Sequence, residues 1–172
     1  MATPIIVTIN DFKGYYNIAS GLKAADISAE IVILEKEYLT KLLGVTLYDA
    51  YAAGTSQDWT DFKTGCTYTD LYGESRRWET NDLKNMLLGF LYYHIVENYI
   101  VKHTTTGYVD PKNQNSERVN KYQELTNMYE RWNKSVDLYK KAYNYIYHTK
   151  DTKTSYANWA FTQIPYKNLI RY

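Results

Sequence analysis

The chain has little of what small disulfide-stapled or metal-binding domains rely on: one cysteine, three histidines and three prolines in 172 residues. A single cysteine, Cys66, excludes an internal disulfide, and the scattered histidines do not form a zinc-type cluster with it. The first residues lack the basic segment and cleavage-type region of a secretory signal. We therefore expect a domain of ordinary size with its own apolar core and no export signal.

Long hydrophobic runs are also missing. The most apolar stretch, residues 86–96, is about half the length that a membrane-spanning helix needs. Lys84 and Glu97 flank it, so a buried helix explains it better, and no membrane contact is expected.

A strong excess of charge of one sign is absent, because 20 Lys and Arg stand against 19 Asp and Glu. This balance disfavours a strongly basic nucleic-acid-binding protein. The charges are unevenly distributed: residues 1–110 carry 9 basic and 14 acidic side chains, net −5, and residues 111–172 carry 11 and 5, net +6. Such polarity suits head-to-tail or side-by-side assembly.

Tyrosine, in contrast, is abundant, with 20 residues beside four Trp and four Phe. A tyrosine ring covers a large area for two side-chain torsions and keeps a hydroxyl for a partner, which favours it at interfaces. The alternative is that tyrosine replaces Leu and Phe in the core. Composition alone leaves both interpretations open.

Hydrophobic periodicity predicts a mainly α fold with about three main helices, a short helix, a small β-hairpin and an extended C-terminal tail. The helices are expected from residue 26 or 28 to Gly44, over residues 47–53, from about residue 82 to 101 as the central core helix, and over residues 116–147. The hairpin is expected from residues 66–70 and 74–78, a short strand at residues 5–9, and a polar loop at residues 104–115. We divide the chain into a helical domain, residues 1–148, and a tail or arm, residues 149–172.

The last helix has the clearest pattern, because its apolar residues are spaced by alternating threes and fours. These residues are Tyr122, Leu125, Tyr129, Trp132, Val136, Tyr139, Tyr143 and Ile146. A seam of this length either pairs with the preceding helix inside the subunit or packs against a neighbour along part of its length. Its aromatic members Tyr122, Tyr129, Trp132, Tyr139 and Tyr143 are therefore interface candidates.

The tail adds further interface candidates, because aromatic side chains lie among polar residues around Pro165. They are Trp159, Phe161, Tyr166 and Tyr172. Such a tail either folds back over its own domain or reaches a neighbour as an arm. The arm interpretation predicts that deleting residues 150–172 harms oligomerisation more than folding.

Catalytic motifs are weak. His94 and Glu97 are three apart on a helix, but a dimetal bundle needs a second such pair, so a core histidine bonded to a tyrosine or backbone group is favoured. Cys66 has no histidine near it in sequence, and no phosphate-binding glycine motif is present. We expect no enzyme activity, no metal and no cofactor. The sharpest basic and aromatic cluster, Arg76, Arg77 and Trp78, makes a DNA- or glycan-binding module the alternative function.

The order of these elements resembles the head-tail connector, or head-completion, proteins of tailed phages, especially the small connectors of crAss-like and other Bacteroidetes phages. The resemblance is carried by EKEYLTKLLGVTLYDAY from Glu35, GCTYT from Gly65, LKNMLLGFLYY from Leu83 and GYVDPKNQNSERV from Gly107. It covers roughly residues 30–147. The heavy use of tyrosine, the Asp110-Pro111 pair and the aromatic tail depart from the family pattern.

The resemblance implies a structural subunit of the virion neck, assembled in the host cytoplasm. Such a subunit forms a ring, of roughly twelve copies to match a portal, that joins the portal to other neck or tail proteins around the channel through which DNA passes. A ring repeats one heterologous interface, so each subunit must offer two complementary flanks. The resemblance implies no bound cofactor and contact with DNA only in transit.

Overall fold

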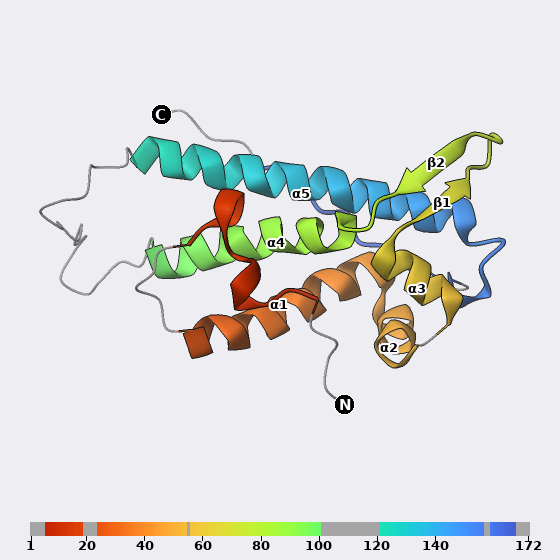
Figure 1. Cartoon of the computed structure of the whole chain (residues 1–172), viewed down its shortest axis with the longest axis horizontal. Coiled ribbons are helices and arrows are strands. Elements are labelled where there is room, and N and C mark those ends of the chain that lie inside the picture. The colour runs from red at the N-terminus through yellow and green to blue at the C-terminus, as the bar shows by residue number, and fades with distance from the viewer. Residues whose placement is uncertain (1–5, 19–23, 55, 101–120, 157–158, 168–172) are drawn as a thin grey trace, which may run out of the picture.

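Three long helices lie side by side and form the body of the computed structural model, which describes residues 6–18, 24–54, 56–100, 121–156 and 159–167 (Figure 1). They are α1 (Ala24–Leu43), α4 (Asp82–Ile95) and α5 (Lys121–Thr149), and a π-helical turn, η3 (Val96–Ile100), extends α4. Two short helices and a hairpin pack at one end. The predicted mainly α class with a small hairpin is confirmed.

The core is densest between α4 and α5, because α4 is buried on most of its circumference and α5 on one face. Along α5 the buried positions recur with heptad spacing, as paired helices require. They are Met128, Trp132, Ser135, Val136, Tyr139, Ala142, Tyr145, Ile146 and Thr149. Over these turns the seam therefore pairs inside the subunit, the first of the two predicted alternatives.

Helix α1 ends at a glycine that turns the chain into α2 (Val45–Ala53). Gly44 adopts a φ of 75°, which a residue with a side chain rarely does, and the predicted helix end is confirmed. Ser28, considered as a cap, lies inside α1 and donates its hydroxyl to the carbonyl of Ala24. The helix thus begins slightly earlier than its pattern indicates.

Between α2 and the hairpin, where no helix was predicted, the chain forms an additional helix, α3 (Gln57–Thr64). Its two apolar side chains, Trp59 and Phe62, are buried. The hairpin pairs β1 (Cys66–Thr69) with β2 (Ser75–Trp78) in antiparallel register, Cys66 opposite Trp78. The predicted hairpin is confirmed, and α3 was missed.

The N-terminal segment is not the strand that its β-branched residues predict. The backbone amides of Ile6 and Val7 donate to the carboxylate of Glu35 at 2.9–3.1 Å, so they have no strand partner. A single 3₁₀ turn, η1 (Ile9–Asp11), follows, and η2 (Gly14–Tyr16) comes next. Glu35 is 1 % exposed, and burial raises its pKa although the two amides act in the opposite direction.

The predicted polar loop at residues 104–115 lies outside the described residues. So do the start of the last predicted helix before residue 121 and the side chains of residues 99–100 and 121–124.

Candidate interaction surface

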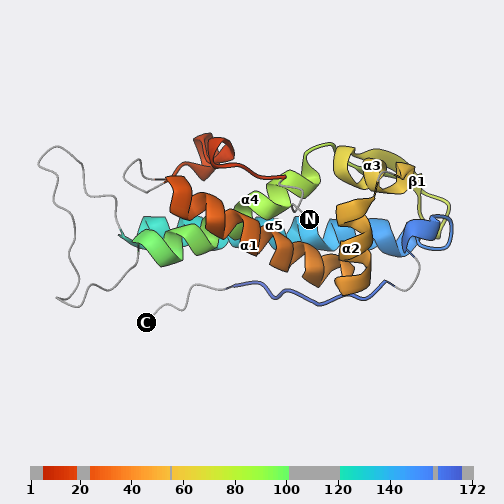
Figure 2. The same ribbon diagram turned by 90° about the horizontal axis from the view of Figure 1, so that it is seen from below.

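The tail runs back along the bundle beside α1 and α5 (Figure 2). It satisfies carbonyls at the C-terminal end of α1, which an isolated helix leaves without partners. The amide of Thr162 donates to the carbonyl of Lys41 at 2.9 Å, and the indole of Trp159 donates to the carbonyl of Leu42 at 2.7 Å. Tail and α1 are thus joined at specific backbone atoms.

On its other side the tail receives hydrogen bonds from side chains of α5. Tyr139 donates to the carbonyl of Thr162 at 2.7 Å, and Trp132 donates to the carbonyl of Pro165 at 3.0 Å. Asn133 uses both ends of its amide to bond the backbone of Lys167, each at 2.8 Å. The described tail residues therefore fold back on their own chain.

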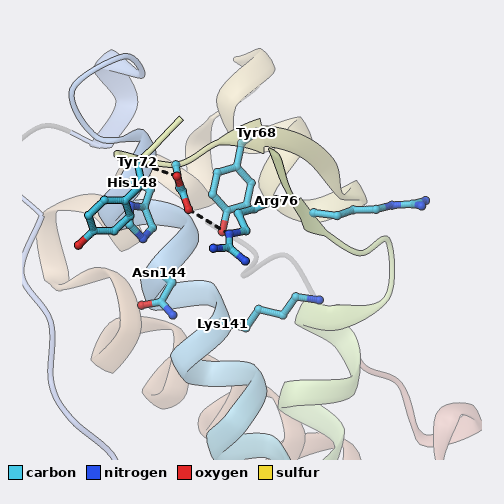
Figure 3. Close-up of a pocket in the computed structure, with 8 residues that line it drawn as sticks. Tyr68, Tyr72, Arg76, Lys141, Asn144 and His148 are labelled. Atoms are coloured by element: carbon cyan, nitrogen blue, oxygen red, sulfur yellow. Dashed lines mark hydrogen bonds and ion pairs between the residues drawn. The ribbon is translucent and has the colours of Figure 1, made fainter. Parts of the chain in front are cut away.

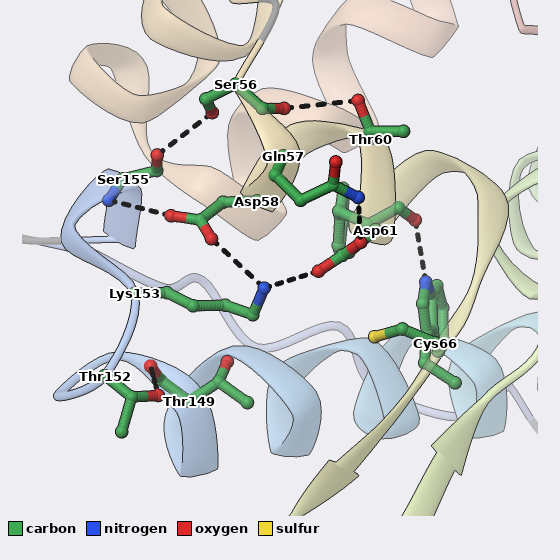
Figure 4. A network of polar contacts seen from close by, with 12 residues as sticks. Ser56, Gln57, Asp58, Thr60, Asp61, Cys66, Thr149, Thr152, Lys153 and Ser155 are labelled. Atoms are coloured by element: carbon green, nitrogen blue, oxygen red, sulfur yellow. Dashed lines mark hydrogen bonds and ion pairs between the residues drawn. The ribbon is translucent and has the colours of Figure 1, made fainter.

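A polar network fixes the turn between α5 and the tail to α3 (Figure 4). The ammonium of Lys153 lies 3.1 Å from a carboxylate oxygen of Asp58 and 2.7 Å from one of Asp61. Burial opposes ionisation of both carboxyl groups, but the contacts with Lys153 outweigh it and lower both pKa values. The fully buried Tyr156 donates its hydroxyl to the carbonyl of Asp58 at 2.8 Å.

Aromatic side chains of α5 and the tail meet at the surface: Tyr143, Tyr147, Trp159 and Phe161. Together with Tyr166, farther along the tail, we name them the aromatic strip. The ring of Tyr143 is the hub, with centroid distances of 4.4 Å to Phe161, 5.0 Å to Trp159 and 5.8 Å to Tyr147. Tyr147 is 38 %, Phe161 36 % and Tyr166 45 % exposed. Four of these five residues were predicted interface candidates.

Two exposed lysines of α5 lie over rings of the strip. Lys140 Nζ is 3.9 Å from the centroid of Tyr166, and Lys150 Nζ is 5.0 Å from that of Tyr147. An ammonium over a ring face is attracted by the ring's quadrupole and still presents its charge to solvent. The strip therefore carries two ammonium groups, beside one carboxylate, Asp137, which accepts the hydroxyl of Tyr166.

Other predicted interface residues serve the core of their own chain. Trp132 is 5 % and Tyr139 1 % exposed, and both are covered by α4 and the tail, so a neighbouring subunit cannot reach them in this conformation. This corrects the prediction for these two residues. Tyr129 is partly buried against Tyr93. The side chain of Tyr122, and all of Tyr172, lie outside the described residues.

The predicted DNA contact also needs correction at one position. Trp78 is 1 % exposed, stacks on Phe62 at 5.9 Å and donates its indole N–H to the carbonyl of Phe62 at 2.7 Å. It is a core residue and offers no face to a ligand. Arg76 and Arg77 are exposed and pair with Asp70 at 3.0 Å and Glu79 at 3.2 Å.

His94 has the structural role that its position indicates. Its Nε2 lies 2.7 Å from the hydroxyl of Tyr38, and Glu97 lies 3.8 Å from Nδ1. Burial lowers the pKa of the ring although Glu97 acts in the opposite direction. Within the described ranges no group of three or more His, Cys, Asp or Glu side chains is placed to bind a metal ion.

Sequence reasoning missed Tyr147 of the strip. Tyr147 lies four residues after Tyr143, a spacing that places the two rings on one helix face, so this signal was available.

None of the helices among the described residues combines the length and hydropathy that crossing a membrane requires. No protein-family model, curated protein or solved structure matches the chain.

Proposed function

We propose that the protein is a structural subunit of a tailed-phage neck, forming a ring with copies of itself between the portal and the tail around the DNA channel. The observation that carries this proposal is the aromatic strip, where α5 and the tail present Tyr143, Tyr147, Trp159, Phe161 and Tyr166 together. Aromatic side chains are enriched at protein interfaces, and Trp and Tyr are enriched among the residues that contribute most of the binding energy. The order of helices and hairpin, in which the sequence resembles connector proteins, supports the same proposal.

The occupant that we propose for the strip is the neighbouring copy. Lys140 and Lys150 make the strip basic, and the chain carries its negative excess in residues 1–110. Among exposed acidic residues in that part are Asp26 and Asp49 of α1 and α2, away from the strip in sequence and element. Opposite charges on two flanks favour a repeated heterologous contact.

A structural rather than catalytic role agrees with how the reactive side chains are used. His94 bonds Tyr38, Glu35 accepts backbone amides, and the thiol of Cys66 lies 3.6 Å from the hydroxyl of Tyr145. Burial raises the pKa of this thiol, so the reactive thiolate is disfavoured. Each of these groups stabilises the fold.

The experiment is a mass measurement by light scattering after size-exclusion chromatography, of the full chain alone and mixed with the portal protein encoded near it. We expect oligomers alone or a complex with the portal. The double variant Tyr147→Ser, Phe161→Ser should lose this association and keep its helical circular dichroism. A matched control, Tyr15→Ser, changes another exposed tyrosine outside the strip. A chain that stays monomeric alone and with portal and tail proteins would contradict the proposal.

A further inference from the structure

A second feature shares no residue with the aromatic strip, although the ring of its His148 lies 5.4 Å from that of Tyr147. A pocket of about 390 Å³ opens between the hairpin and the C-terminal turns of α5 (Figure 3). Lys141, Asn144 and His148 line it from one face of α5, since they are three and four residues apart. Tyr68 and Arg76, opposite each other in the hairpin register, line the other side.

The only carboxylate in the pocket lining, Asp70, has its oxygens occupied within the hairpin. One oxygen accepts the amides of Tyr72 and Glu74, each at 2.9 Å, and the other accepts Nε of Arg76 at 3.0 Å. Its side chain is 2 % exposed, and these bonds lower its pKa against the opposing effect of burial. Asp70 therefore stays ionised, orients Arg76 and leaves the pocket with little capacity to accept hydrogen bonds.

The remaining groups are mostly donors. His148 accepts the amide of Leu71 at its Nδ1, at 3.3 Å, so the neutral ring carries its proton on Nε2 and can donate there. Arg76 uses Nε for Asp70 and keeps its two terminal nitrogens, with 57 % of the side chain exposed. Lys141, at 2.6 Å from Asp82, is still 40 % exposed and has further protons to donate.

We propose that this pocket binds a phosphate group, with the terminal guanidinium nitrogens of Arg76 and the ammonium of Lys141 as its principal contacts. Asn144 and His148 would donate from the adjacent turn of α5. A tetrahedral oxyanion suits donors that converge from two elements, and guanidinium and ammonium groups are the usual phosphate partners in proteins. Tyr72, 85 % exposed beside the pocket, could stack on a base if the phosphate belongs to a nucleic acid.

The test is a ¹H–¹⁵N NMR titration of the full chain at low ionic strength with inorganic phosphate and, separately, with a short oligothymidylate. Chloride at matched ionic strength serves as the blank. We expect saturable shifts at Arg76 Nε, the Asn144 amide and His148 with phosphate. If the phosphate of a nucleic acid is the ligand, the oligonucleotide should bind more tightly than inorganic phosphate. The logarithm of its binding constant should then fall with the logarithm of the salt concentration, with a slope of about −0.7 for each phosphate contacted.

The variant Asn144→Asp places a negative charge in the pocket without breaking any of its ion pairs. It should weaken phosphate binding by roughly fivefold or more. Gln163→Glu adds the same charge on the exposed tail and should leave affinity unchanged. Binding of phosphate alone, without the oligonucleotide, would support a site for free phosphate. Absence of saturable shifts with both probes, or equal binding by Asn144→Asp and the control, would overturn the proposal.

Discussion

At the scale of single residues, Gly89 marks a close approach between α4 and α5. A Cβ added there would lie 1.9 Å from Oγ of Ser135 and 2.7 Å from the carbonyl oxygen of Arg131. Ser135 is fully buried, and its hydroxyl has no hydrogen-bond partner among the described residues. Glycine inside a helix ordinarily costs about 1 kcal/mol relative to alanine, so here it is the interhelical packing that requires glycine.

We predict that Gly89→Ala lowers the free energy of unfolding by about 1–3 kcal/mol, because the added methyl group separates the two helices. Ser135→Ala alone should be close to neutral, since its hydroxyl makes no hydrogen bond that would be lost. Urea denaturation of both single variants and the double variant measures the coupling free energy between positions 89 and 135. Partial recovery in the double variant is expected, whereas a stabilised Gly89→Ala chain would contradict the packing explanation.

His94 gives the fold a dependence on pH whose sign follows from its environment. Burial lowers its pKa in the folded chain below the ordinary 6.5, so the unfolded chain binds the proton more tightly. Its contribution to stability is present above pH 6.5 and is lost as the pH falls through the lower, folded value.

We therefore predict that the urea midpoint decreases between about pH 7.5 and pH 5 in the parent chain, and decreases less in His94→Gln. Glutamine keeps a polar group for the hydroxyl of Tyr38 but does not titrate. His148→Gln is the control, because its ring lies near the surface at the hairpin. An identical pH profile for the parent and His94→Gln would remove His94 as the cause.

At the scale of elements, the sequence predicted those that are determined by their own apolar spacing. Helices α1, α2, α4 and α5 and the hairpin follow from periodicity and from Gly44. Helix α3 was missed because only Trp59 and Phe62 in its eight residues are buried. The strand at residues 5–9 was wrong because the distant side chain of Glu35 takes its amides, which local propensity cannot indicate.

The candidate site was predictable in composition but not in geometry. The aromatic residues of α5 and the tail were identified, yet separating the buried Trp132 and Tyr139 from the half-buried Tyr143 requires the position of the tail. We predicted Trp78 to lie at the surface because two basic residues, Arg76 and Arg77, precede it. Strand alternation explains the result, since Arg77 points away from the core while Trp78 points into it.

For the tail, the contacts lead to a different expectation from the one based on sequence. Deleting residues 159–172 removes the buried Ile164 and uncovers Trp132 and Tyr139, and should cost about 2–4 kcal/mol of stability. Deleting residues 150–172 also removes Tyr156 and Lys153 and should cost about 3 kcal/mol more. Thermal and urea unfolding of the two truncated chains will measure both steps. Unchanged folding in the longer deletion, with association lost, would favour the arm interpretation instead.

At the scale of the whole molecule, the uneven charge distribution predicts how assembly responds to salt. The net charge is −5 over residues 1–110 and +6 over residues 111–172, so neighbouring copies attract when opposite regions meet. Exposed charges are screened over about 10 Å at 0.1 M salt. The attraction should therefore weaken at higher ionic strength, while the aromatic contact remains.

We predict that self-association weakens several-fold as NaCl is raised from about 0.05 M to 0.5 M, with no loss of helical signal. Analytical ultracentrifugation at each salt concentration measures this. In Lys140→Gln, Lys150→Gln the association should be weaker at low salt and less sensitive to salt. Association that strengthens with salt in the parent chain would show that apolar contacts alone drive it.

The backward path of the tail also determines when the fold can be finished. Translation makes α1 and α5 before residues 159–167, yet those residues lie against both helices and bond Lys41, Leu42 and Trp132. Until those residues fold back, the rings of Trp132 and Tyr139 lack their cover, and chaperones bind exposed aromatic surface of this kind. Return of the tail, rather than collapse of the helices, is then the step that hides these rings from neighbouring molecules.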